Sequence, residues 1–251
     1  MPDKPAGRGH RMYMSPVKEY ALAHGLHLMQ PEKLRDPSFV NELQSLNADL
    51  FVVIAFRMLP QVVWQMPRLG TFNLHASLLP DYRGAAPINW AVINGDTHTG
   101  VTTFFLKHEI DTGDVIDQCA IDITDEDNVG TVHDRLMVLG ADLVERTLAH
   151  IVAGDLKTTP QSAMASKQCR PAPKIFRETC HIDWTRPAIE VHNLVRGLSP
   201  YPGAWTTLCA DNLTPTDFKV FATRVDTDAD INASPGTIIA ETDSLGVVCG
   251  D

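Results

Sequence analysis

The sequence predicts an α/β protein in which a Rossmann-like, doubly wound parallel sheet is followed by a small OB-like β-barrel. Three observations lead to this prediction. The apolar run Leu50–Phe56 is typical of a strand that is buried on both faces. Helical and strand patterns alternate around it, which favours a parallel sheet covered by helices. After about residue 158 prolines interrupt the chain, and short strand patterns separated by turns follow, as in small barrels.

The segment before the apolar run predicts a loop and two helices. Residues 2–18 hold prolines, glycines and cations with little apolar periodicity, and they are expected to form a long exposed loop. Ser15 and Pro16 open a helix that ends at about His24, before Gly25, because serine caps helices and proline suits their first turn. Apolar residues at helical spacing predict a second helix over 36–46.

Three strands and two helices are predicted after the apolar run. The strands cover residues 71–75, 100–106 and 115–123, and a short helix that begins with proline covers 87–94. The longest helix covers 128–154. Its predicted apolar face consists of Val132, Leu136, Leu139, Leu143, Leu148 and Ile151.

The change in composition predicts two domains. Residues 1–165 are expected to form the larger domain, 166–180 a linker, and 181–251 the barrel domain. The linker region carries the basic residues Lys167, Arg170, Lys174 and Arg177. A helix is predicted over 187–198, and the predicted barrel strands cover 200–208, 218–225, 236–239 and 246–249.

Composition excludes several classes of protein. A chain of 251 residues that is 44% hydrophobic and 21% charged is globular rather than disordered, and it lacks both a signal-peptide pattern and a long apolar span. Its five cysteines are scattered and form no Cys-x-x-Cys pair. A formal charge of −10 restricts any nucleic-acid contact to a local patch. We therefore expect a cytoplasmic monomer that binds neither a membrane nor a metal.

Asn73, His75 and Asp111 are the candidate catalytic residues. An amide donor, an imidazole and a carboxylate are the groups that stabilise and collapse a tetrahedral acyl intermediate. A covalent route lacks its nucleophile, because Ser77 does not stand in a Gly-x-Ser-x-Gly elbow and the nearest cysteine is Cys119. The pattern therefore indicates direct acyl transfer from donor to acceptor.

Several long motifs of the chain resemble those of the folate-dependent formyltransferases, in the same order and spacing. They reach from the N-terminus to about residue 208, and therefore cover most of the chain. The matching segments are residues 2–9, 73–88, 95–96, 99–102, 111–114, 182–184 and 200–204, with Asn193 and Arg196.

The resemblance implies a donor, an acceptor and a site. The donor would be 10-formyltetrahydrofolate, and the acceptor the α-amino group of methionine on initiator tRNA. Asn73, His75 and Asp111 would be catalytic. The folate pocket would be lined by Ser77, Leu78, Leu79 and Pro80.

The N-terminal segment distinguishes between branches of that family. Pro-Ala-Gly-Arg-Gly with flanking cations resembles the branch that formylates methionyl-tRNA, so Lys4, Arg8 and Arg11 are expected to contact tRNA. Glycinamide ribonucleotide and amino sugar nucleotides remain alternative acceptors, and a non-catalytic RNA-binding fragment is a further alternative. Relative to the family pattern, the first strand-helix-strand and the end of the barrel are expected to be missing.

The other polar residues have structural interpretations. The remaining histidines are expected to be non-catalytic, Asp114 to be a turn or folate-loop residue, and Gly84 to form a close-packed turn into a helix. The charged positions of the long helix are expected to face solvent. These are Asp134, Asp142 and Glu145.

Overall fold

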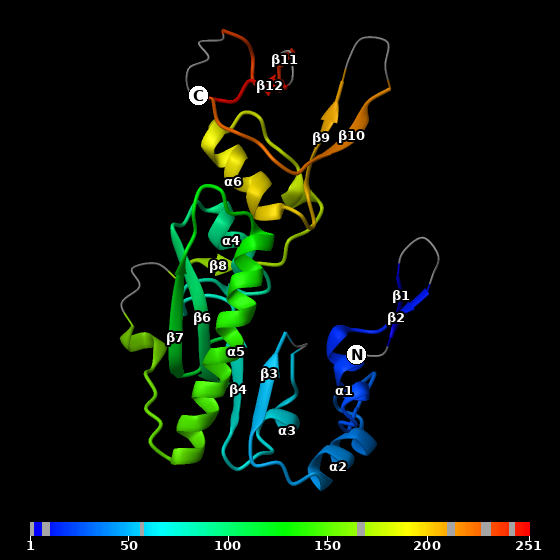
Figure 1. The fold of residues 1–251 in the computed structure, drawn as a ribbon, viewed down its shortest axis with the longest axis vertical. Coiled ribbons are helices and arrows are strands. Elements are labelled where there is room, and N and C mark those ends of the chain that lie inside the picture. The colour runs from blue at the N-terminus through cyan, green and yellow to red at the C-terminus, as the bar shows by residue number, and fades with distance from the viewer. Residues whose placement is uncertain are drawn as a thin grey trace. The chain divides into compact units, whose positions relative to one another are not determined.

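The computed structural model describes residues 3–6, 11–55, 58–164, 169–209, 214–226, 232–240 and 244–251. It consists of two units, residues 1–71 and 72–251, which are described separately below (Figure 1). None of the helices in these described ranges is long and apolar enough to cross a membrane.

The first unit opens with a hairpin, where the sequence predicted an exposed loop. Strands β1 (Lys4–Ala6) and β2 (Arg11–Tyr13) pair antiparallel, so the loop prediction is wrong for these residues. Helix α1 (Pro16–Ala23) follows as predicted, and the Ser15 hydroxyl accepts a hydrogen bond from the backbone N–H of Lys18 at 3.2 Å. Helix α2 (Pro37–Ser45) lies within the predicted range 36–46.

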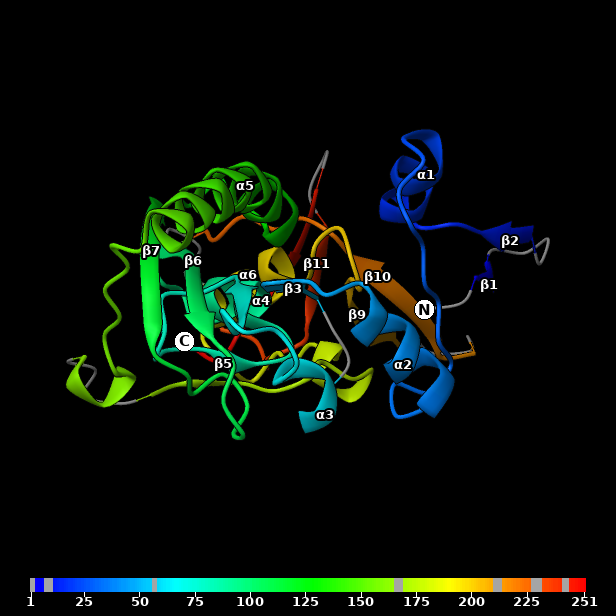
Figure 2. The same ribbon diagram turned by 90° about the horizontal axis from the view of Figure 1, so that it is seen from below.

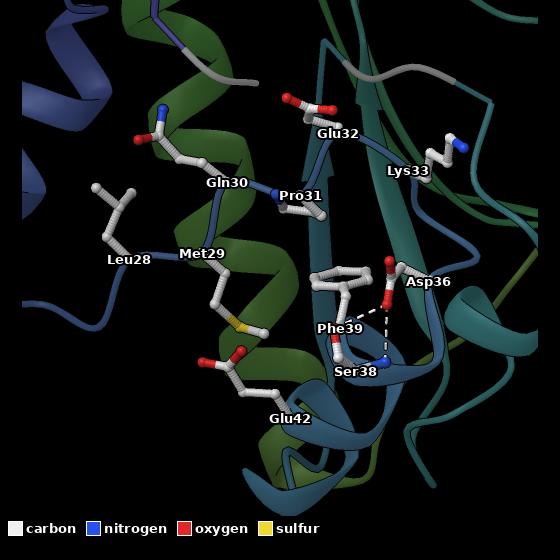
Figure 3. Close-up of a pocket in the computed structure, with 10 residues that line it drawn as sticks. All are labelled: Leu28, Met29, Gln30, Pro31, Glu32, Lys33, Asp36, Ser38, Phe39 and Glu42. Atoms are coloured by element: carbon white, nitrogen blue, oxygen red, sulfur yellow. Dashed lines mark hydrogen bonds between the residues drawn. The ribbon is translucent and has the colours of Figure 1, made fainter.

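A pocket in the first unit is lined by the segment 28–42 (Figure 3). Asp36, which caps α2, is one of the lining residues and accepts hydrogen bonds from the backbone N–H and the hydroxyl of Ser38, at 2.9 and 2.8 Å. Met29 and Phe39 supply apolar lining, whereas Glu42 is acidic. The lining includes none of the candidate catalytic residues.

The predicted apolar strand is present as β3 (Phe51–Ile54), but it is not buried on both faces. Val53 is buried, whereas Val52 is 41% exposed and Ile54 is 59% exposed. The prediction of a strand is therefore confirmed and the prediction of two buried faces is wrong. Its last predicted residue, Phe56, lies outside the described residues. A short helix, α3 (Gln61–Trp64), follows and was not predicted.

The α/β fold class is confirmed, but the sheet is not wholly parallel, because one strand runs antiparallel to both of its neighbours. Strand β6 (His98–Phe105) pairs antiparallel with both β4 (Thr71–His75) and β7 (Val115–Asp122). Residues 106–114, which join β6 to β7, contain no helix. Parallel neighbours need a long crossover connection, so this short link makes the chain turn back on itself.

Helix α5 (Val129–Ala153) packs along β6 and β7 (Figures 1 and 2). Asn128 caps it by accepting hydrogen bonds from the N–H groups of Gly130 and Thr131 at 2.8 and 3.1 Å, and it ends at Gly154, whose φ is +71°. Four of its six predicted apolar-face residues are buried, and its predicted charged positions are exposed. The four are Val132, Leu136, Leu143 and Ile151.

The second unit contains further helices and short strands. Helix α4 (Pro87–Ile93) packs against α6 (Ala188–Leu198), and both were predicted within two residues. Short strands β5 (Arg83–Gly84) and β8 (Pro171–Ala172) pair in parallel. Single turns of 3-10 helix cover Gln161–Ala163 and Glu178–Cys180.

The predicted C-terminal strands pair as two hairpins. Strand β9 (Ala204–Leu208) pairs with β10 (Thr216–Val220), and β11 (Ile238–Ala240) pairs with β12 (Leu245–Val247), both antiparallel. In the described ranges these are two separate sheets, and closure into an OB-like barrel stays a prediction. The domain boundaries at 165 and 180 also stay a prediction.

Candidate active site

The structure brings the side chains of Asn73, His75 and Asp111 to one place in the second unit. Asn73 and His75 are two residues apart on β4 and so point to the same face of the sheet. Asp111 comes from the segment between β6 and β7, and its Oδ2 lies 3.9 Å from Nδ1 of His75. All three are buried, with exposed fractions of 3, 7 and 7%. The cluster combines one proton carrier, one carboxylate and one amide.

The orientation of the His75 ring is set by a backbone carbonyl. Its Nε2 lies 2.8 Å from the carbonyl oxygen of Tyr82, and because a carbonyl can only accept, Nε2 carries the hydrogen. In the neutral ring the lone pair therefore belongs to Nδ1, on the side of Asp111. The Phe104 ring contacts the imidazole edge to face, with 6.4 Å between centroids.

Asp111 is held in an unusual backbone conformation. Its φ is +56°, in the left-handed region that residues other than glycine rarely adopt. The N–H of Gly84 donates to its Oδ2 at 2.9 Å, and Nε2 of the buried Gln161 donates to the carbonyl oxygens of Asp111 and Gly113, both at 2.8 Å. Arg83 in turn donates to Oε1 of Gln161 at 3.0 and 2.6 Å. These contacts stabilise the conformation that directs the carboxylate toward His75.

The Asn73 side chain contains an unsatisfied polar atom. Its Oδ1 is buried, and no group in the described part of the chain forms a hydrogen bond with it. A buried polar atom without a partner costs about 1 to 3 kcal/mol of stability. Such groups concentrate at functional sites, where a ligand can bond the carboxamide.

The predicted folate-pocket residues follow directly after this strand. The Ser77 hydroxyl donates to the carbonyl oxygen of Asp81 at 2.7 Å, and the Leu79 N–H donates to the hydroxyl of Thr102 at 3.2 Å. Gln118 donates to the Leu79 carbonyl oxygen at 2.9 Å. Ser77, Leu79 and Pro80 are buried, whereas Leu78 is half-buried. The segment is therefore rigidly held, and Leu78 supplies most of its accessible apolar surface.

The predicted tRNA-contacting residues belong to the first unit. The backbones of Lys4 and Arg11 lie in β1 and β2, where Lys4 is opposite Tyr13 and Arg11 is opposite Ala6. Arg8 lies outside the described residues.

Two further residues, Asp114 and Gly84, have structural interpretations from the sequence. Asp114, expected to be a turn or folate-loop residue, forms an ion pair with Lys107 at 2.7 Å, and its contact with folate stays a prediction. Gly84 has a φ of +128°, and a methyl group there would overlap the carbonyl oxygen of Ala172, so the predicted close packing is confirmed. Gly84 lies in strand β5, however, and not in a turn. In the described residues, no three His, Cys, Asp or Glu side chains are grouped as metal ligands would be.

Sequence reasoning missed the residues that position this site. Tyr82 acts through its carbonyl oxygen, which every residue possesses, so its side chain gives no signal. Gln161 contacts a loop that lies 50 positions earlier in the chain. To predict the role of Gln161, one would have to know that it contacts Asp111, and a single sequence does not show which distant residues are in contact.

Two protein-family models match the chain. The model described as formyl transferase matches residues 1–148, and the model described as formyl transferase, C-terminal domain, matches residues 174–251. The chain is 66% identical to a methionyl-tRNA formyltransferase from Bacteroides fragilis over 83% of this chain and 64% of that relative. A relative with the same name from Bacteroides thetaiotaomicron is 61% identical over 88% of this chain and 69% of its own length. The chain thus spans about two thirds of the length of these curated relatives.

Solved structures with low sequence identity share the fold. One is an N-formyltransferase from Helicobacter canadensis in complex with folinic acid and dTDP-3-aminofucose, with a TM-score of 0.69 at 18% identity, over 94% of this chain and 79% of that one. Another is HypX from Aquifex aeolicus in complex with tetrahydrofolic acid, with a TM-score of 0.63 at 22% identity, over 85% of this chain and 36% of that one.

Proposed function

Because this chain belongs to the formyl transferase family, we propose that it transfers the formyl group of 10-formyltetrahydrofolate to the α-amino group of methionine on initiator tRNA. The observation that carries the proposal is the 66% identity to a methionyl-tRNA formyltransferase. By contrast, the N-formyltransferase from Helicobacter canadensis, solved with a sugar nucleotide, is 18% identical. The acceptor is therefore proposed to be the charged tRNA rather than a sugar nucleotide.

The proposed reaction is a direct displacement at the formyl carbon. The amine nitrogen attacks that carbon, a carbon–nitrogen bond forms, and the formyl oxygen becomes an oxyanion. Collapse of the tetrahedral intermediate breaks the bond to N10 of the folate and restores the carbonyl. The amine loses a proton and N10 gains one, so the reaction needs one group that accepts and returns a proton.

The His75 ring supplies that group in the proposed mechanism. Because Nε2–H is bonded to the Tyr82 carbonyl, Nδ1 is the nitrogen that accepts the proton of the attacking amine. The imidazolium that forms then lies 3.9 Å from the Asp111 carboxylate, which stabilises its positive charge. Nδ1–H next returns the proton to the leaving N10.

Asn73 has a separate role in the proposal. Its carboxamide donates a hydrogen bond to the developing oxyanion, a type of interaction worth about 3 to 4 kcal/mol for one well-placed donor. The absence of a protein partner for its Oδ1 in the described ranges supports an amide that is oriented by a ligand. We place the folate against Ser77, Leu78, Leu79 and Pro80, where Leu78 offers accessible apolar surface.

A direct comparison of acceptors tests the proposed reaction. With 10-formyltetrahydrofolate as donor, the protein is expected to formylate charged initiator tRNA and to leave glycinamide ribonucleotide and an amino sugar nucleotide unmodified. Product formation is measured with a radiolabelled formyl group, with the His75→Ala variant as the control for background transfer. Preference for either small acceptor contradicts the proposal. Binding of tRNA without turnover supports an RNA-binding fragment instead.

Replacing Arg8 by alanine is expected to raise the KM for tRNA while kcat at saturating tRNA is retained. We propose that Lys4, Arg8 and Arg11 contact tRNA phosphates, and losing one such contact lowers the slope of log affinity against log salt by about 1. The measurement is KM at several salt concentrations. The matched control is Arg35→Ala, which removes an exposed arginine of the same unit. An equal change in both variants contradicts a specific contact at Arg8.

A further inference from the structure

The peptide that orients His75 adopts a conformation that other contacts must stabilise. Tyr82 accepts the Nε2–H bond of His75 through its carbonyl, and the preceding carbonyl, of Asp81, accepts the hydroxyl of Ser77. The φ of Tyr82 is +61°, a value that bulky residues rarely adopt because it is strained. The direction of the Tyr82 carbonyl therefore depends on whatever holds this strained residue.

Arg170 holds the Asp81–Tyr82 peptide through its backbone. The N–H of Tyr82 donates to the carbonyl oxygen of Arg170 at 2.6 Å, and the N–H of Arg170 donates to Oδ1 of Asp81 at 3.1 Å. These two bonds connect the segment after β4 to a position that lies beyond α5 in the chain.

The side chain of Arg170 holds the Tyr82 ring. Its guanidinium lies over the ring, 4.6 Å from the centroid, and donates to both oxygens of Asp96, at 2.6 and 2.7 Å. The Tyr82 hydroxyl donates to the same carboxylate at 2.8 Å and accepts from Nδ2 of Asn94 at 3.1 Å. Arg170, Asp96 and Tyr82 thus form a closed triangle in which each side chain contacts the other two.

The charges in this triangle favour a single arrangement. The bidentate hydrogen bond to Asp96 raises the pKa of Arg170 above its usual value, so the guanidinium stays charged. Burial raises the pKa of Tyr82, which keeps its hydroxyl protonated as a donor. The Asp96 side chain is 16% exposed and the Arg170 side chain 41% exposed, so the carboxylate of this pair is shielded from solvent and the guanidinium is partly open to it.

We propose that Arg170 is a positioning residue for His75. By holding the ring and the backbone of Tyr82, Arg170 directs the Tyr82 carbonyl at Nε2 of His75 and so keeps the Nδ1 lone pair on the side of Asp111. The effect on turnover rests on the proposed formyl transfer, whereas the effect on the His75 tautomer does not. The sequence alone places Arg170 among the basic residues of the predicted linker and gives it no role in the site.

The test compares Arg170→Met with a matched control from the same region. Arg177 makes the same two kinds of contact, with its guanidinium 4.7 Å from the Trp205 ring centroid and an ion pair to Asp217 at 2.7 Å. Arg177→Met therefore removes the same kinds of interaction, a ring contact and an ion pair, at a more exposed position that does not involve Tyr82. Arg170→Lys keeps the positive charge but lacks the planar fork, so it separates charge from geometry.

Two measurements are made on each variant of the 251-residue chain. Steady-state kinetics give kcat and KM for the tRNA and the folate donor. Nuclear magnetic resonance of histidine-labelled protein at about pH 8.5, where an ordinary imidazole is neutral, gives the protonated nitrogen of His75. The His75 signal is assigned from its loss in His75→Gln.

Arg170→Met is expected to lower kcat about ten- to a hundredfold with both KM values nearly unchanged, because misplacing a reacting group by about 1 Å costs up to a hundredfold. The His75 signal should change from the Nε2–H tautomer alone to a mixture of tautomers. Arg170→Lys should retain part of both properties, and Arg177→Met should retain all of them.

Other results would contradict either the positioning role of Arg170 or the proposed reaction. If Arg170→Met lowers kcat but leaves the His75 tautomer unchanged, the positioning role is overturned. It is also overturned if Arg170→Met changes neither kcat nor the tautomer. If Arg170→Met does not fold, Tyr82→Phe takes its place, since it removes the hydroxyl that bonds Asp96 and Asn94 and keeps the ring. An unchanged tautomer and kcat in that variant overturns the proposal. A tautomer shift in a protein that transfers no formyl group supports the positioning role and contradicts the proposed reaction.

Discussion

His75→Gln is expected to lower kcat for formyl transfer about a hundredfold or more, within the range that general acid–base groups contribute. A glutamine amide can still donate to the Tyr82 carbonyl, which Nε2 now contacts at 2.8 Å, but it cannot accept and return a proton as Nδ1 does. KM for tRNA should change little, because the lost interaction acts on the reacting atoms. Single-turnover kinetics with charged tRNA measure the chemical step directly.

The control for this substitution is His192→Gln. His192 is partly buried and its Nδ1 lies 3.0 Å from the Thr223 hydroxyl, so the change again replaces a hydrogen-bonded imidazole by an amide. His192 is not among the candidate catalytic residues, and its variant should transfer the formyl group at the wild-type rate. Loss of tRNA affinity with unchanged turnover in His75→Gln contradicts the catalytic role of His75.

Asn73→Ala is expected to lower kcat by about a hundredfold to a thousandfold, as the loss of one oxyanion donor does. Its effect on stability should be small or favourable, because the alanine variant no longer buries Oδ1 without a partner. Thermal unfolding monitored alongside kcat checks both parts. The expected pattern, low activity with an undiminished melting temperature, is typical of a residue that is retained for function at a cost in stability.

Asn89→Ala provides the opposite pattern as a control. The Asn89 Nδ2 donates to the Gly197 carbonyl oxygen at 2.8 Å and so joins α4 to α6. Its loss should lower the free energy of unfolding by about 1 kcal/mol while kcat is retained. If Asn73→Ala instead melts at a lower temperature than Asn89→Ala and keeps its activity, Asn73 is a structural residue and its proposed role is wrong.

The sequence alone determined the elements whose signals are local. Helix α5 was predicted almost to the residue, because its apolar spacing, its cap at Asn128 and its stop at Gly154 all lie within the segment itself. Asn73 and His75 could be placed on one face of a strand, since residues two apart in a strand share a face. The chemistry of this pair followed from the residue types.

Only the tertiary structure decided how those elements meet. Pairing of β6 with β7 is antiparallel because the chain turns back through residues 106–114, and the apolar residues of β3 do not reveal that two of them are exposed. The position of Asp111 depends on Gln161, and the tautomer of His75 depends on a backbone carbonyl. Such contacts join residues far apart in the chain and often use backbone atoms, which are the same at every position, so no local pattern of side chains encodes them.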